Sequence, residues 1–164
     1  MSVHYPVSSH VLPNGLTVLI SEDHLVPEVS INIGVSVGSR HETPGQTGLA
    51  HLFEHLMFEG SENVAEGEHF AELMGHGGRL NATTSFDRTT YFESVPSGAA
   101  ELSLWMEADR HTRLLPALTQ ANVDNQRDVV VEEKRQRYDN QPYGDALEAM
   151  CAVTFPVDHP YHHT

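Results

Sequence analysis

The chain has 164 residues, of which 39% are hydrophobic and 20% charged, which is typical of one folded globular domain. Its net charge of -14 argues against binding to nucleic acid or to a membrane surface, because both attract clustered Lys and Arg. We find neither a long apolar segment nor a secretory signal in the sequence, so we expect no transmembrane helix. The single cysteine, Cys151, excludes an intrachain disulfide; we predict that it is buried and that the protein is cytoplasmic.

The first third of the chain contains signals for a hairpin, a strand and a short helix. A Pro-Asn-Gly turn separates residues 9–12 from residues 16–22, which predicts a β-hairpin. Residues 29–37 alternate apolar and small polar side chains, the period of a half-buried strand. A helix is expected around residues 51–55, with Thr47 as its N-cap.

The remainder of the chain predicts three helices and two strands. Residues 65–74 form a helical pattern that stops at a glycine-rich cluster. Residues 79–85 and 89–95 are rich in Thr, Tyr and Phe, as strands are. A helix capped by a serine is expected over residues 98–111, and a longer one over residues 120–138. This order predicts an α+β fold, a mostly antiparallel sheet packed with helices.

The most informative segment is the H-x-x-E-H motif formed by His51, Glu54 and His55. Residues i and i+4 of a helix share one face, so both imidazoles can bind the same Zn²⁺ ion. Glu54 lies beside them and can act as a base on water activated by the metal. The alternative interpretation is a solvated helix face that carries two histidines by chance.

A catalytic zinc site needs three protein ligands and one open position, so a third ligand must come from another segment. The candidates are Glu132 and Glu133, which follow three valines in the expected long helix. An acidic pair on a helix can also be part of its solvated face, and the residues alone leave this alternative open.

Three blocks of sequence together resemble the pitrilysin family of inverzincins, which includes the insulin-degrading enzyme and the mitochondrial processing peptidase. The blocks are His51 to Gly60, Gly77 to Tyr91, and Gln126 to Glu133. The resemblance implies a processing-peptidase-like α/β roll, here incomplete at its C-terminus. It also implies that residues 1–164 are the N-terminal catalytic, zinc-binding domain, or most of it, of a longer two-domain protein. A second homologous domain or subunit is the expected partner.

The resemblance also implies roles for individual residues. His51, His55 and a distal glutamate hold one Zn²⁺ ion, and Glu54 is the general base. The family's pattern of an apolar stretch followed by one variable residue selects Glu133, whereas the usual spacing points to Glu132. We favour Glu133 as the third ligand, because a loop insertion of one residue is tolerated more easily than a shift of helical register. The family commonly has an acidic residue two turns earlier; this chain has Gln126, so we expect bound zinc with reduced activity.

The resemblance further implies that Asn81, Ala82 and Thr83 form an exposed edge onto which a peptide substrate adds as an extra strand. An ordinary edge strand is the structural alternative. The expected function is that of a zinc endopeptidase acting on unfolded or extended peptides. One rival is an inactive or partner-dependent peptide-binding subunit that serves as a scaffold. Another is a lyase similar to the S-ribosylhomocysteine-cleaving enzyme, which needs more than the one cysteine of this chain.

The other aromatic and histidine residues near the motif receive structural assignments only. We expect Phe53 and Phe58 to be core residues, because large aromatic side chains are usually buried. His41, His69 and His76 are expected on the surface, without a role.

Overall fold

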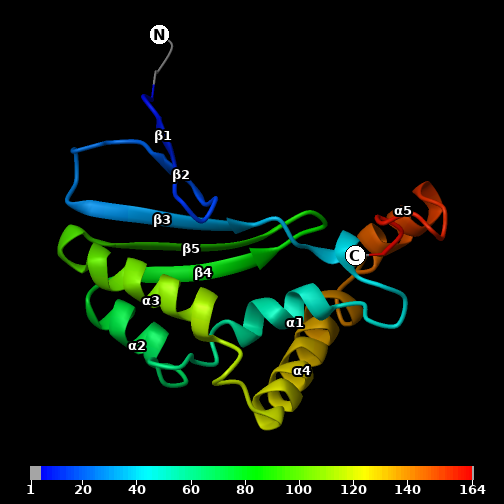
Figure 1. The fold of residues 1–164 in the computed structure, drawn as a ribbon. Coiled ribbons are helices and arrows are strands. Elements are labelled where there is room, and N and C mark those ends of the chain that lie inside the picture. Colours follow the sequence, from blue (N-terminus) through cyan, green and yellow to red (C-terminus); the bar gives the residue numbers. More distant parts are fainter. Residues whose placement is uncertain (1–4, 164) are drawn as a thin grey trace.

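The computed structural model describes residues 5–163 and confirms the α+β fold (Figure 1). Two antiparallel sheets are present, a hairpin of β1 and β2 and a three-stranded sheet of order β3–β5–β4. The strands are β1 (Ser8–Val11), β2 (Thr17–Ile20), β3 (Glu28–Val35), β4 (Arg79–Thr84) and β5 (Thr89–Pro96). The helices are α1 (Leu49–Leu56), α2 (Glu68–Gly75), α3 (Ala100–Arg113), α4 (Gln120–Lys134) and α5 (Ala146–Thr154).

The main core lies between the central strand β5 and the helices α2 and α3, which lie side by side along the sheet in Figure 1. Side chains of β5 alternate between buried and more exposed positions, as expected for a strand covered on one face. Val95 of β5 packs with Leu73 of α2 and Met106 of α3, and all three are almost completely buried. The sheet therefore has a firm support on this face.

Helix α1 connects this core to α4. It contacts the edge strand β4 on one side and α4 on the other. A second apolar cluster lies where α1 ends, formed by Met57, Ala82, Tyr91 and Leu114. The H-x-x-E-H helix is thus fixed between an edge strand and a long helix that comes much later in the chain.

The start of α1 is stabilised by Glu42, and the predicted N-cap Thr47 is wrong. The N-cap is Gly48, whose φ of 87° lies in the left-handed region that glycine adopts readily. The carboxylate of Glu42 accepts hydrogen bonds from the backbone N–H groups of Gly48 (3.0 Å) and Ala50 (2.8 Å). Since the negative charge also faces the positive end of the helix dipole, a side chain six residues away replaces the local cap.

Glu42 is held in place by a close contact between two loops. The 3-10 turn η1 (Ser39–His41) donates two backbone hydrogen bonds to the β4–β5 turn, to the carbonyls of Ser85 and Phe86. A Cβ atom on the preceding Gly38 would lie 2.1 Å from the Ser85 oxygen, so only glycine allows this approach. The loop before α1 is therefore tied to the end of the sheet.

The helix over residues 98–111 begins differently from the prediction. A 3-10 turn, η2 (Ser97–Ala99), precedes α3, and the predicted serine cap is wrong because no side chain caps this helix. The α-helical part of the long helix, α4, ends at Lys134, and a π-helical segment, η3 (Arg135–Asp139), follows it directly.

Helix α5 was not predicted from the sequence. Cys151 is its buried residue, as predicted. Residues after α5 return to the sheet, since the hydroxyl of Tyr161 donates to Asp87 in the β4–β5 turn (2.6 Å). Among the described residues, none of the helices combines the length and the apolar character needed to cross a bilayer.

Candidate metal centre

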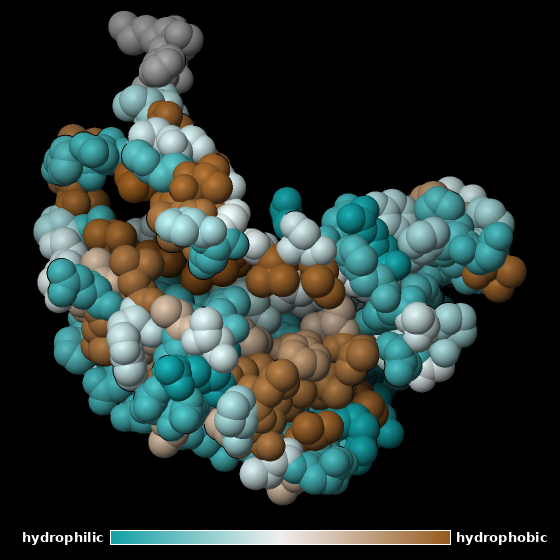
Figure 2. Space-filling model, in the orientation of Figure 1, coloured by the Kyte–Doolittle hydropathy of each residue, from teal (hydrophilic) through white to brown (hydrophobic). Residues whose placement is uncertain are grey.

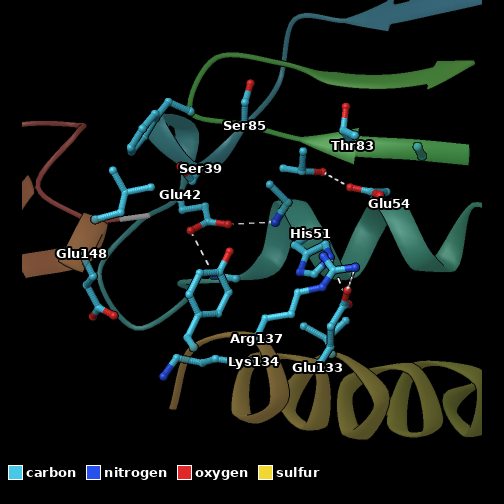
Figure 3. A pocket seen from close by; sticks show the side chains of 18 of the residues that line it. Ser39, Glu42, His51, Glu54, Thr83, Ser85, Glu133, Lys134, Arg137 and Glu148 are labelled. Carbon is cyan, nitrogen blue, oxygen red and sulfur yellow. Dashed lines mark hydrogen bonds and ion pairs between the residues drawn. The ribbon is translucent and has the colours of Figure 1, made fainter. Parts of the chain in front are cut away.

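Two imidazoles and one carboxylate meet between α1 and α4. His51 and His55 are one helical turn apart on α1, and their Nε2 atoms lie 3.3 Å from each other. Oε2 of Glu133 on α4 lies 3.5 Å from Nε2 of His51 and 3.2 Å from Nε2 of His55. Figure 3 shows His51 and Glu133 pointing toward each other from the two helices. These three residues form a group that could hold a metal ion.

The two candidate glutamates of α4 occupy different environments. Glu133 points at the imidazoles, and its side chain is 21% exposed. Glu132 points away, is 53% exposed, and contacts Arg135 and Gln136 in the following turn. One residue of helical register, about 100° of rotation, separates the two positions.

The three atoms match the size of a zinc coordination shell. A tetrahedral ion with bonds of about 2.0–2.1 Å keeps its ligand atoms about 3.3 Å apart. The three separations here are 3.3, 3.5 and 3.2 Å. Oε2 of Glu133 is buried and has no hydrogen-bond partner among the described residues, whereas its Oε1 accepts from Arg137 at 2.7 Å. One carboxylate oxygen is thus oriented while the other remains available.

The electrostatic environment favours a neutral imidazole at His51. Burial lowers the pKa of His51 below its ordinary value of 6.5, although the nearby carboxylates of Glu54 and Glu133 act in the opposite direction. A neutral imidazole has a free lone pair, which metal binding requires.

Glu54 lies on α1 with its carboxylate aimed at the sheet. The hydroxyl of Thr84 on β4 donates to Oε2 of Glu54 at 2.5 Å, the contact drawn as a dashed line at Glu54 in Figure 3. Glu54 is only 8% exposed, yet it lines the same cavity as His51 and Glu133. The role of Thr84 was missed in the sequence, because a threonine at the end of a strand carries no local signal of its partner.

A cavity of about 470 Å³ runs from His51 along β4 toward α5. Ala82, Thr83 and Thr84 line one wall of this cavity. Asn81 is exposed outside it, and its side-chain oxygen accepts a hydrogen bond from the Ala82 N–H at 2.9 Å. Within residues 5–163, β4 pairs with β5 alone, so β4 is an edge strand beside the candidate metal centre.

A second group with metal-binding residue types lies inside the core, and it corrects the prediction for His69. His69 is 3% exposed and lies 3.6 Å from Glu93 and 3.8 Å from Glu107. Arg110 already pairs with Glu107 and is equally buried. Because this guanidinium supplies a positive charge within the group, a second cation there is disfavoured.

The aromatic residues next to the motif divide between core and surface. Phe58 packs against the cluster around Met57 and Tyr91, in agreement with the prediction. Phe53 is 43% exposed, so its assignment to the core is wrong for the described residues. Its ring contributes apolar surface to the outside of α1.

An α+β domain that places an H-x-x-E-H helix opposite a distal glutamate belongs to the class of inverzincin-type metallopeptidase domains. Comparison with known proteins identifies the particular family. The insulinase family (peptidase family M16) matches residues 17–160, and the chain belongs to this family.

Individual relatives agree with this assignment. The chain is 37% identical to the zinc protease PqqE of Helicobacter pylori over 157 residues, 95% of the chain and 35% of that protein. It is 29% identical to the mitochondrial-processing peptidase subunit beta of Blastocladiella emersonii, covering 88% of the chain and 30% of that protein. The crystal structure of a protease from Helicobacter pylori superposes with a TM-score of 0.91 at 35% identity, over 98% of this chain and 38% of that one. The chain thus spans about a third of the length of these relatives.

Proposed function

We propose that this chain is the zinc-binding catalytic domain of an endopeptidase that hydrolyses unfolded or extended peptides. The observation that carries the proposal is the convergence of Nε2 of His51, Nε2 of His55 and Oε2 of Glu133 at separations close to a tetrahedral edge. Family membership and a relative named as a zinc protease support the choice of zinc.

His51, His55 and Glu133 would hold one Zn²⁺ ion. When bound, zinc supplies Lewis-acid activation of water and of a scissile carbonyl. Burial that favours neutral His51 and a Glu133 oxygen without another partner both fit this ligand set. Arg137, in the π-helical segment η3, pairs with Oε1 of Glu133. Oε2 of Glu133 therefore remains available for the metal.

Glu54 is the proposed general base. Its carboxylate takes a proton from the attacking water and later delivers it to the leaving amine. The hydrogen bond from Thr84 fixes the orientation of the Glu54 carboxylate, whose second oxygen has no hydrogen-bond partner within residues 5–163. The base therefore faces the cavity in one defined position.

The substrate is proposed to add to the free edge of β4 along Asn81, Ala82 and Thr83. Such addition uses backbone hydrogen bonds, so it tolerates many sequences but requires an extended chain. The position of β4 at the sheet edge and along the cavity supports this arrangement. A peptide lying there would pass directly over Thr84 and reach Glu54.

A second homologous domain or subunit is proposed to complete the active protein. The chain spans about a third of its relatives, one of which is named as a subunit. Exposed apolar side chains gather on the β1–β2 hairpin and around α1 (Figure 2). They include Val11 and Leu19 on the hairpin and Phe53 on α1. A surface of this kind suits coverage by further protein.

The single cysteine favours a reducing compartment, the cytoplasm.

The experiment that tests the function measures zinc content and cleavage of a fluorogenic peptide on the purified gene product. We expect one zinc per chain and cleavage that a chelator abolishes and added zinc restores. Glu54→Gln should keep the zinc and lose cleavage, because it removes the base but no ligand. Zinc without cleavage in the unaltered protein would favour the alternative, an inactive peptide-binding subunit that serves as a scaffold.

A further inference from the structure

The imidazole of His55 is held on its far side by Gln126 of α4. Nδ1 of His55 lies 3.2 Å from Oε1 of Gln126. An amide oxygen only accepts hydrogen bonds, so this contact requires the proton of the neutral imidazole to be on Nδ1. The lone pair is then on Nε2, the atom that faces His51 and Glu133.

The orientation of the Gln126 amide decides which nitrogen of His55 carries the proton. If the amide were turned by 180°, its NH₂ group would face Nδ1 and Nδ1 would have to accept. The proton would then move to Nε2 and point at the two other candidate ligands. A metal ion could not bind Nε2 in that form.

Glu59, in the turn after α1, sets this orientation. Nε2 of Gln126 donates to Oε1 of Glu59 at 2.6 Å. A carboxylate only accepts, so the NH₂ end of Gln126 must face Glu59 and the oxygen end must face His55. The other oxygen of Glu59 accepts from Nδ2 of Asn122 at 3.0 Å.

The capping box of α4 fixes the next link. The backbone N–H of Thr119 donates to Oδ1 of Asn122 at 3.1 Å, which turns the Asn122 NH₂ group toward Glu59. The backbone N–H of Thr119 only donates and the carboxylate of Glu59 only accepts, so these two groups fix the orientations of the Asn122 and Gln126 amides. The series therefore runs without ambiguity from the N-terminus of α4 to Nδ1 of His55.

We propose that Glu59 is a positioning residue that, through Gln126, holds the proton of His55 on Nδ1 and keeps Nε2 free for the metal. The inference rests on the proposed zinc site. It adds to that site the carboxylate of Glu59, which contacts the His55 imidazole only through Gln126. An outer group of this kind typically changes metal affinity by about 10- to 100-fold.

A swap of two side chains tests the proposal. Glu59→Gln has a single oxygen for two donors, Gln126 and Asn122, so one amide must turn. The double variant Glu59→Gln with Gln126→Glu restores every polarity. Its carboxylate at position 126 accepts from Nδ1 of His55 and from the side-chain NH₂ group at position 59, whose oxygen then accepts from Asn122.

Two single variants complete the series. Gln126→Met, which cannot accept from Nδ1, tests the link to His55 with Glu59 unchanged. Glu62→Gln, which alters an exposed glutamate paired with Arg113, is the matched control. We expect the control to behave like the unaltered protein.

Two readouts apply to the purified gene product. Nitrogen-15 NMR of the zinc-free protein reports which ring nitrogen of His55 is protonated, and competition with a chelating dye reports zinc affinity. We expect the Nδ1–H form in the unaltered protein, a mixed population and about 10-fold weaker zinc binding in Glu59→Gln, and recovery of both in the double variant.

Unchanged tautomer and affinity in Glu59→Gln would overturn the proposal, as would a folded double variant that does not recover. The tautomer measurement needs no metal. If the unaltered protein failed to bind zinc, the proposed function would fall, while the NMR result would still decide the role of Glu59.

Discussion

The hydroxyl of Thr84 on β4 lies 2.5 Å from Oε2 of Glu54 on α1 and donates a hydrogen bond to it. This contact joins the edge strand to the proposed general base. The strand on which a peptide is proposed to lie thereby also orients the group that handles the proton. In the proposed mechanism, peptide binding and proton transfer would therefore be coupled through the side chain of Thr84.

Thr84→Val should lower kcat by about 10- to 100-fold, because a displaced base loses its alignment with the reacting water. Valine has nearly the shape of threonine but no hydroxyl, so packing is retained. Zinc content should not change. Steady-state kinetics on a fluorogenic peptide, together with metal analysis, measures both quantities.

Two comparisons make the Thr84 result specific. Thr84→Ser keeps the hydroxyl and should stay within a few-fold of the unaltered rate. Thr112→Val removes an exposed threonine hydroxyl on α3 and should have no effect on kcat. A Thr84→Val protein with unaltered kcat would show that Glu54 needs no orientation from β4.

The buried pair of Glu107 and Arg110 predicts a large effect on stability. The two side chains are 2% and 3% exposed and pair with each other inside the core. Arg110→Met leaves the Glu107 carboxylate buried without its partner, which should cost about 3–5 kcal/mol of unfolding free energy. Urea denaturation measures the change. Adding Glu107→Met should recover most of the loss, and failure of that recovery would show that the pair has another structural role.

The order and type of most elements could be predicted from local patterns. The Pro-Asn-Gly turn, the alternation of residues 29–37 and the helical period before the glycine cluster each correspond to an observed element. These signals lie within a few residues of the structure they specify. The cap of α1 has no such local signal, because Glu42 is six residues from Gly48 and its position depends on a contact between two loops.

The environment of individual histidines was less predictable. His51 and His55 share a face because helical spacing requires it. His69 has the same local character as a surface histidine, yet it lies beside Glu93 and Glu107, which come from β5 and α3. Partners so distant in sequence leave no periodic signal. Arg137 next to Glu133 was missed although it lies at i+4, a spacing that does identify ion pairs on helices.

The lowered pKa of His51 predicts how the stability of the zinc-free protein depends on pH. The unfolded state takes up a proton at the ordinary value of 6.5, and the folded state only at lower pH. The unfolding free energy should therefore fall as pH decreases below 6.5, until the folded imidazole is also protonated. Urea denaturation with a chelator on either side of this value measures the change, and His51→Gln should remove that part of it. An equal pH dependence in both proteins would contradict the prediction.

Strand addition at β4 predicts a positional pattern in substrate binding. Along a β-strand, the backbone N–H and C=O groups of every second residue bond to the neighbouring strand, and those of the residues in between point away from it. Peptides with a single N-methyl group should therefore bind poorly and normally at alternating positions. KM values for a series methylated at successive residues measure the pattern. A uniform effect along the peptide would indicate that β4 does not act as the template.

The measurement that tests the central claim most directly is zinc affinity in Glu133→Gln and Glu132→Gln. The two residues are adjacent on α4, carry the same charge, and differ in whether they face His51 and His55. We predict one zinc per chain in the unaltered protein, a loss of affinity of more than about 100-fold in Glu133→Gln, and unaltered binding in Glu132→Gln. Equal affinities in the two variants, or a greater loss in Glu132→Gln, would contradict the metal centre described here.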